Sequence, residues 1–350
     1  MRLRLLLLYG GLLLLFKLYL TYVAFTGDYA TFTSDAQDYM RIAHNLKTHG
    51  IFSSDPHPPL KHDVIRMPIY PLLLALLGGK GTLVLQHLLL LLVVLLLWRR
   101  GWRREALILF LSPTVSVFVN QNLTEGLFAP LIALLLTVRV RVWGLLWGLL
   151  ALLRQATVLL FPPILLVDVW RSKRWSYALL HITLFLTPVV AWTGVNWLKG
   201  GAPIFSGVFT TTVAVYLVER FYDITPHIRA YSDIPQMGVW ITDLQRVAFG
   251  WMLHHPVESL VLWLKETFFT VVKAIPRGYL YPFGPMWPVA YLMFYPYLLY
   301  IYRETVRSKA LFGISLFYIL AVGLPGDPRL RLPVEIMAIM WPVFRRMRGR

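Results

Sequence analysis

Residues 83–98 read LVLQHLLLLLVVLLLW and are followed directly by Arg99 and Arg100. An uncharged apolar run of about this length is typical of a helix that crosses a membrane. Similar runs recur along the whole chain of 350 residues, which is 57% hydrophobic and only 15% charged. Such a composition excludes an ordinary soluble globular domain. We therefore expect an all-α, polytopic integral membrane protein.

Basic residues gather in short clusters between the apolar runs. The formal net charge of +17 would suggest a nucleic-acid partner in a soluble chain. Here more than half of the Lys and Arg residues stand in six clusters with few acidic neighbours, and such clusters orient helices by staying in the cytoplasm. We therefore expect membrane lipids and no nucleic acid as partners. The clusters are Arg2 and Arg4; Arg99, Arg100, Arg103 and Arg104; Arg139 and Arg141; Arg171, Lys173 and Arg174; Arg303, Arg307 and Lys309; and Arg345, Arg346, Arg348 and Arg350.

The alternation of runs and clusters predicts about ten transmembrane helices in the plasma membrane, with both termini cytoplasmic. Two long connections then face outside, a first outer loop over 26–66 and a second outer segment over 199–277, which includes a surface helix over 255–273. Residues 68–77 are too short to span, and Gly78, Gly79 and Gly81 break them, so we expect a hairpin or interfacial piece there. We expect residues 1–350 to form one membrane domain without a separate soluble C-terminal domain. The predicted spans are 3–25, 83–98, 106–120, 126–138, 142–153, 157–170, 175–197, 279–302, 310–324 and 333–344.

The first outer loop contains a well-delimited helix over residues 35–49. Ser34 and Gln37 form a capping box, and Gly50 supplies the stop. At about 100° per residue, Asp35 falls at the centre of the apolar stripe and Asp38 on its edge, so Asp35 should face protein or membrane. An acid in the first turn also stabilises a helix through the dipole, by about 0.3–1 kcal/mol, which leaves a structural role open.

Residues 34–50 and 66–76 follow the patterns S-D-A-x-x-Y-x-x-I-A-x-N-L-x-x-x-G and R-x-P-x-Y-P-L-x-L-A-L. These patterns resemble the first outer loop of the GT-C glycosyltransferases, above all the branch of the protein O-mannosyltransferases and the lipid A aminoarabinose transferases. The aminoarabinose transferases carry Glu-Lys-Pro where this chain has Arg66-Met67-Pro68, so their donor specificity does not carry over. Other segments similar to the family follow in order: 122–128 with Glu125, 153–156 with Arg154, and 327–333 with Arg329 and Arg331.

This resemblance implies a membrane glycosyltransferase that works at the extracytoplasmic face. It would move a monosaccharide from a polyprenyl-phosphate carrier to a lipid, glycan or protein acceptor and invert the anomeric centre, with Asp35 as general base. The departing phosphate requires cations, which arginines near outer helix ends could supply. Tyr39 and Tyr70 suit interfacial packing equally well, and Arg154 could simply bond helix-end carbonyls. The expected substrate-binding residues are Asp38, Tyr39, Arg66, Tyr70, Glu125, Arg154, Arg329 and Arg331.

We expect no metal and no other cofactor. The chain has no cysteine, and its nine histidines show no spacing typical of metal ligands. The alternative function is a secondary transporter or a flippase for lipids or lipid-linked sugars. Transporters place ionisable residues near the bilayer midplane and often contain repeated halves. Here the acids and arginines outside the basic clusters lie mostly at predicted outer ends, and no internal repeat is evident, which favours an enzyme.

Overall fold

The computed structural model describes residues 2–138, 140–172, 175–214, 234–273, 275, 277–322 and 328–348. Every regular element within these ranges is a helix, so the all-α prediction is confirmed for them. Four residues of the predicted basic clusters, Arg139, Lys173, Arg174 and Arg350, lie outside the described residues. Residues 215–233 of the second outer segment and Asp327 also lie outside them.

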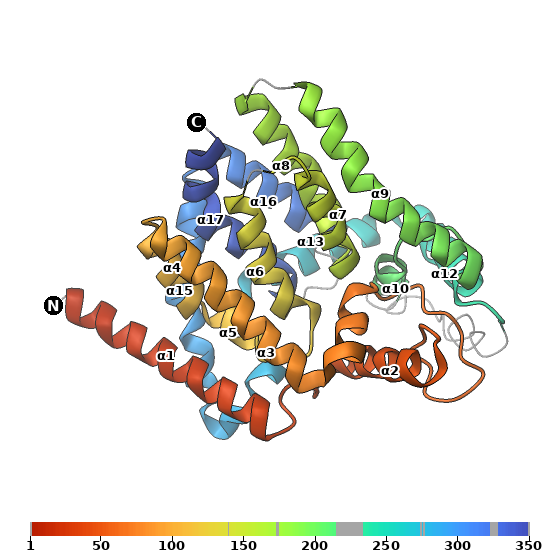
Figure 1. Ribbon diagram of the computed structural model, residues 1–350, viewed down its shortest axis with the longest axis horizontal. Coiled ribbons are helices and arrows are strands. Elements are labelled where there is room, and N and C mark those ends of the chain that lie inside the picture. The colour runs from red at the N-terminus through yellow and green to blue at the C-terminus, as the bar shows by residue number, and fades with distance from the viewer. Residues whose placement is uncertain are drawn as a thin grey trace.

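Figure 1 shows α1 along one edge of the molecule and α17 at the upper left, beside the C-terminus. The helices are α1 (Arg2–Thr26), α2 (Ser34–His49), α3 (Ile69–Arg99), α4 (Arg103–Leu111), α5 (Pro113–Phe118), α6 (Thr124–Thr137), α7 (Trp143–Leu153), α8 (Thr157–Ser172), α9 (Trp175–Gly200), α10 (Val208–Val213), α12 (Met237–His254), α13 (Pro256–Val272), η3 (Arg277–Met286), α14 (Trp287–Leu292), α15 (Phe294–Val306), α16 (Lys309–Val322), η4 (Pro328–Arg331) and α17 (Leu332–Arg348).

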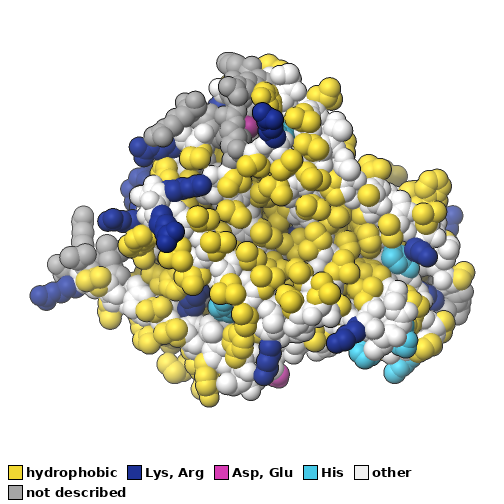
Figure 2. All heavy atoms as spheres, in the orientation of Figure 1, with side chains coloured by type: hydrophobic (Ala, Val, Ile, Leu, Met, Phe, Trp, Pro, Cys, Tyr) yellow, Lys and Arg dark blue, Asp and Glu magenta, His cyan; other side chains and the backbone are white. Residues whose placement is uncertain are grey.

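Three described helices are long and apolar enough to cross a membrane, namely α1 over Leu7–Thr26, α3 and α9. Much of their leucine and valine surface is exposed on the molecule. Figure 2 shows hydrophobic side chains covering a broad part of one face, with Lys and Arg mainly along its margins. Contiguous apolar surface of this extent is unfavourable in water. The length, composition and exposure of these helices indicate a membrane protein.

The prediction of ten spans was wrong for the described residues. The remaining apolar runs form helices that are too short for a full span of about 20 residues. The run 106–120 is divided at Ser112, whose side chain caps α5 by accepting from the N–H of Val115 at 3.2 Å. The run 279–302 is divided into η3, α14 and α15, because Pro282 and Pro285 lack donors and Gly284 leaves helical geometry.

Gly78 interrupts α3 at a kink and divides it into two helical parts, as the glycine-rich stretch predicts. Gly78 has φ +70° and ψ 172°, a conformation open to glycine. The helix then continues through Leu83 to Arg99. The part before the kink, Ile69–Leu77, is a short helix and not a hairpin, and the predicted break at Gly78 is confirmed.

Helix α6 lies in the core, and its two ends have different surroundings. Nearly every side chain of α6 and α17 is buried. At the C-terminal end of α6, Arg100 donates to the carbonyl of Thr137 at 3.0 Å, and the neighbouring Arg104 lies 3.7 Å from Glu304. Glu125 stands in the first turn, about 20 Å away by helix geometry. The basic clusters at residues 99–104 and 303–309 thus meet at the end of α6 opposite Glu125.

A smaller hydrophobic cluster joins the second outer segment to the first loop. Val64 packs there with buried side chains of α10 and α12, including Met237 and Ile241. The N–H of Gly207 donates to the carbonyl of Val64 at 2.8 Å, and the hydroxyl of Ser206 donates to Ile65 at 2.8 Å. Helix α10 and residues 64–66 are thereby held side by side. Helix α12 supplies most of this cluster and was not predicted from the sequence.

Helices α7 and α9 approach each other through two glycines, and Figure 1 shows them side by side. A Cβ atom on Gly144 would lie 2.2 Å from the carbonyl oxygen of His181, and one on Gly148 would lie 2.5 Å from that of Phe185. This G-x-x-x-G spacing places both glycines on one helix face, which lets two backbones approach closely.

Gly144→Ala should destabilise the protein, because the added methyl group cannot fit against the backbone of α9. Overpacking of this kind typically costs about 1–3 kcal/mol, measurable as a lower midpoint of thermal unfolding in detergent. Gly194→Ala in α9 is the matched control, since a Cβ at Gly194 meets no neighbouring atom. Equal unfolding temperatures for the two variants would contradict the close contact of α7 and α9.

Candidate functional site

Helix α2 carries Asp35 and Asp38 close to its capped N-terminus. Thr33 is the N-cap, with a hydroxyl that accepts from the N–H of Ala36 at 3.2 Å. The predicted capping box on Ser34 is therefore displaced by one residue. Gly50 closes the helix with φ +69°, as predicted. Asp35 and Tyr39, one turn apart, consequently point to the same side of α2.

A buried aspartate positions Arg66 opposite α2. Asp63 accepts from the N–H groups of Ile65 and Arg66 at 2.7 and 2.9 Å and from the hydroxyl of Ser54 at 2.5 Å. This turn directs the Arg66 guanidinium toward the carboxylates of α2. One of its Nη atoms lies 2.7 Å from Asp35 and 2.6 Å from Asp38.

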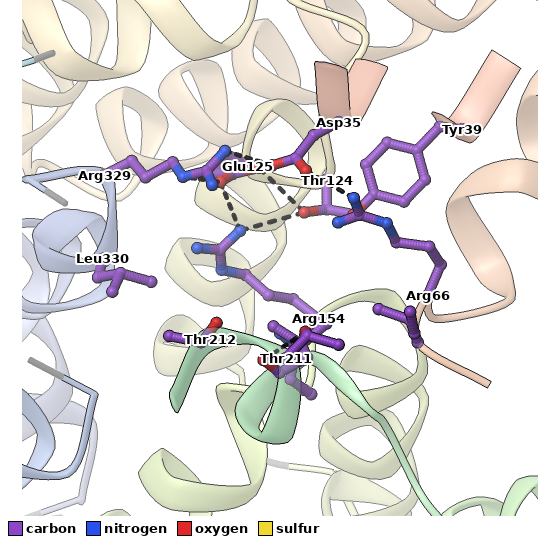
Figure 3. Close-up of a pocket in the computed structure, with 13 residues that line it drawn as sticks. Asp35, Tyr39, Arg66, Thr124, Glu125, Arg154, Thr211, Thr212, Arg329 and Leu330 are labelled. Atoms are coloured by element: carbon purple, nitrogen blue, oxygen red, sulfur yellow. Dashed lines mark hydrogen bonds and ion pairs between the residues drawn. The ribbon is translucent and has the colours of Figure 1, made fainter. Parts of the chain in front are cut away.

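Arg329, in η4, reaches Asp35 from the opposite end of the sequence. Its Nη1 lies 2.5 Å from Oδ2 of Asp35, so the two oxygens of this carboxylate contact two different arginines. The Nε atom of Arg329 is 4.0 Å from Glu125. Figure 3 shows the side chains of Arg329, Asp35 and Arg66 converging from three separate parts of the fold.

Glu125 and Arg154 form a buried ion pair beneath Asp35. Arg154 follows the last residue of α7, and its Nη1 lies 2.7 Å from Oε1 of Glu125. The hydroxyl of Thr124 accepts from Arg154 at 3.1 Å and donates to Glu125 at 3.0 Å. The position of Glu125 in the first turn of α6 is favourable for an acid. Each member of this buried ion pair therefore has Thr124 as a second hydrogen-bond partner.

These groups line a cavity of about 320 Å³. The structure brings six of the nine predicted site residues to its wall. Thr211 and Thr212 of α10 were not predicted, although the run Thr210–Thr212 is a polar interruption that could have indicated them. The lining residues are Asp35, Tyr39, Ile65, Arg66, Thr124, Glu125, Arg154, Gln155, Val208, Thr211, Thr212, Arg329 and Leu330.

Asp38 and Tyr70 support the cavity from behind its wall. Asp38 bonds Arg66 and also pairs with Arg41 on the outer side of α2. The ring of Tyr70 packs against that of Tyr39 at 5.3 Å, and its hydroxyl donates to Gln86 at 2.9 Å. Neither residue lines the cavity, so both act here by holding residues that do.

Arg331 lies outside the cavity, in contrast to the prediction that groups it with the other arginines. Its Nε donates to Glu335 at 2.8 Å. Its Nη1 donates to the carbonyls of Thr270, Val271 and Lys273 at 3.0, 2.8 and 2.7 Å. These carbonyls end α13, so Arg331 ties the start of α17 to that end. Because alternate residues of η4 face different ways, Arg329 enters the cavity while Arg331 enters the core.

The charged form of Asp35 is strongly favoured. Burial alone would raise its pKa, but Arg329 and Arg66 outweigh burial and hold the pKa of Asp35 well below its usual range. Asp35 is thus an anion clamped by two cations at neutral pH. Within the part of the chain that the structure describes, no cluster of three His, Asp or Glu side chains is arranged to hold a metal ion.

Arg331→Met should destabilise the protein by about 3–5 kcal/mol, because it leaves the Glu335 carboxylate buried without its cation. Arg331→Met combined with Glu335→Leu should recover most of this loss, since an apolar pair removes the unpaired charge. Thermal unfolding in detergent measures both effects. The control is Arg246→Met, which removes an exposed guanidinium paired with Asp243. If the single Arg331 variant unfolds like wild type, Arg331 does not anchor α13.

Asp35 should stabilise the protein at neutral pH and lose this contribution in acid. Its pKa in the folded protein lies below its ordinary value of 3.8, so the stabilisation is complete above that value and is lost as the pH falls toward the folded pKa. Wild type should therefore lose thermal stability relative to Asp35→Asn as the pH falls from about 4 to about 2. A constant difference across that range would contradict the double clamp.

Comparison of the chain with known proteins found no match. No protein-family model, no curated protein and no solved structure is similar to it. The resemblance to the GT-C glycosyltransferases thus depends on the residue patterns alone. The function of the cavity has to be argued from its own chemistry.

Proposed function

We propose that the protein is a membrane glycosyltransferase of the GT-C type. In this proposal it moves a monosaccharide from a polyprenyl-phosphate carrier to a lipid, glycan or protein acceptor. The observation that carries the proposal is the convergence of Asp35 with Arg66, Arg154 and Arg329 in one cavity. A carboxylate beside several guanidinium groups supplies a base together with a binding site for a phosphate.

The proposed reaction is a single displacement at the anomeric carbon. The acceptor hydroxyl attacks that carbon, a new carbon–oxygen bond forms, and the bond to the phosphate oxygen breaks. Asp35 takes the proton of the hydroxyl, and the carrier phosphate leaves with the electron pair. Because the phosphate leaves as an anion, no second carboxylate has to protonate it, in contrast to glycoside hydrolysis. The displacement inverts the anomeric centre and requires no metal ion.

The neutral side of the cavity suits a sugar ring. Gln155, Thr211 and Thr212 line it together with the charged groups. Their amide and hydroxyl groups can both donate and accept hydrogen bonds, as sugar hydroxyls require. A volume of about 320 Å³ is at the lower end of the range for small-molecule sites. The cavity therefore suits a sugar and a phosphate, and the carrier chain would extend into the membrane.

The arrangement of charges supports a site on the outer face of the plasma membrane. The basic clusters at residues 99–104 and 303–309 meet at one end of α6, and Glu125 with the cavity lies at the other. Since clustered Lys and Arg residues stay in the cytoplasm, the cavity would face outside.

Asp35→Asn should lower sugar transfer by about 10²- to 10⁴-fold, the usual contribution of a general base. The assay follows transfer of labelled sugar from polyprenyl-phosphate donors by the purified protein in lipid nanodiscs. The matched control is Asp243→Asn, which changes an acid of α12 that pairs with Arg246 and does not line the cavity.

Full transfer by a folded Asp35→Asn protein would exclude Asp35 as the base. If no donor is consumed while the protein in liposomes carries a solute or a lipid-linked sugar across the bilayer, the protein is a transporter or flippase.

A further inference from the structure

Both oxygens of the Asp35 carboxylate contact guanidinium groups, Oδ1 with Arg66 and Oδ2 with Arg329. Charge-assisted hydrogen bonds of this kind are among the strongest in proteins. Accepting a proton would weaken both of them, so the clamped carboxylate is a poor base. Asp35 therefore needs to lose one cation before it can act in the proposed reaction.

Arg66 and Arg329 differ in their contacts and in their exposure. Arg66 has Asp38 as a second carboxylate partner at 2.6 Å, a backbone fixed by Asp63, and the ring of Tyr39 at 5.4 Å. The side chain of Arg329 is 25% exposed, compared with 17% for Arg66. Because its side chain is more exposed, an incoming ligand reaches Arg329 more easily than Arg66.

The surroundings of Arg329 provide a second position for its guanidinium. Glu125 lies 4.0 Å from its Nε, a distance at which the charges attract without a normal hydrogen bond. Glu125 is already paired with Arg154 at 2.7 Å, so it does not depend on Arg329. A small rotation of Arg329 toward the cavity would therefore leave neither carboxylate without a cation, since Arg66 remains on Asp35.

The charges of the cavity wall favour an incoming anion. Three guanidinium groups and two carboxylates line it, which leaves a surplus of one positive charge. A phosphate ester offers several acceptor oxygens and matches the planar fork of an arginine. Such a ligand would compete with Asp35 for the same donors.

We propose that a phosphate ester entering the cavity takes Arg329 away from Asp35, and that this exchange makes Asp35 a competent base only while the phosphate is bound. This inference rests on the proposed function and adds that phosphate binding regulates the basicity of Asp35. Loss of the cation and arrival of a nearby anion both favour protonation of the carboxyl. Among the described residues, the other charged or titratable groups around Asp35 are Arg66, Asp38, Tyr39, Glu125 and Arg154, and they keep their positions in this exchange.

The exchange would also protect the sugar donor from water. While Arg329 clamps Asp35, the carboxylate cannot efficiently deprotonate a water molecule in the cavity. Once the phosphate of the donor holds Arg329, the unclamped oxygen of Asp35 is next to the substrate. The base would thus become active at the moment when the donor is in position.

The test is a double-mutant cycle on phosphate binding, because competition predicts a coupling between Asp35 and Arg329. The probe is dodecyl phosphate, measured by calorimetry with the full-length protein in phosphatidylcholine nanodiscs. Asp35→Asn should bind the probe about tenfold more tightly than wild type, because the competing carboxylate is gone. In the Arg329→Gln background, Asp35→Asn should change the affinity by less than about twofold. Asp243→Asn, the control, should bind like wild type.

An unchanged or weaker affinity of Asp35→Asn would overturn the exchange. An equal gain with and without Arg329 would also overturn it, because it would reflect only the removal of a negative charge. Arg329→Lys keeps the cation and is a second variant if Arg329→Gln does not fold. In the Arg329→Lys background, Asp35→Asn should retain most of its gain, and loss of that gain would count against the competition.

Parallel titrations with inorganic phosphate identify the source of the anion. If dodecyl phosphate binds more tightly than inorganic phosphate and shows the coupling between Asp35 and Arg329, the anion is a lipid headgroup. If inorganic phosphate binds more tightly and shows that coupling, the anion is free phosphate. These assays contain no sugar, so they are independent of the transfer assay. Coupled binding without any sugar transfer would overturn the proposed transferase and leave the exchange in place.

Discussion

The ion pair of Glu125 and Arg154 is the constraint around which the cavity is organised. Both side chains are almost fully buried, and their charges are 2.7 Å apart. Removing either partner would leave an uncompensated charge in a largely apolar core. The end of α7 and the start of α6 are therefore fixed relative to each other. Thr124, which also lines the cavity, bonds both members of the pair.

The arginines of the cavity differ in role because they differ in their partners. Arg154 is committed to Glu125 and Thr124, and Arg66 is held by Asp38 and by the turn at Asp63. Arg329 combines higher exposure with a contact to Asp35 that a ligand could replace. A phosphate site composed only of fixed arginines would leave the base permanently clamped. In the proposed exchange, release of the more exposed Arg329 would make the basicity of Asp35 depend on the ligand.

The sequence predicted the individual helices better than their relation to the membrane. The start of α2 to within one residue, its stop at Gly50 and the inward direction of Asp35 follow from local capping and periodicity, which need no tertiary information. The number of spans did not follow, because apolar runs in a buried core and in a membrane look alike. Ser112 and Pro282 divide two of these runs, and α6 is apolar because it lies within the protein.

Site residues could be predicted where they belong to a sequence motif. They could not be predicted where tertiary packing decides which side chain reaches the cavity. Arg329 and Arg331 stand two residues apart in the same motif, yet one reaches the cavity and the other the end of α13. Only the position of α13 distinguishes them, and that position depends on contacts distant in sequence. Thr211 reaches the cavity because Gly207 and Ser206 bond to residues 64 and 65, so that α10 lies beside Arg66. A polar residue in a long connection therefore becomes informative only once the partner of that connection is known.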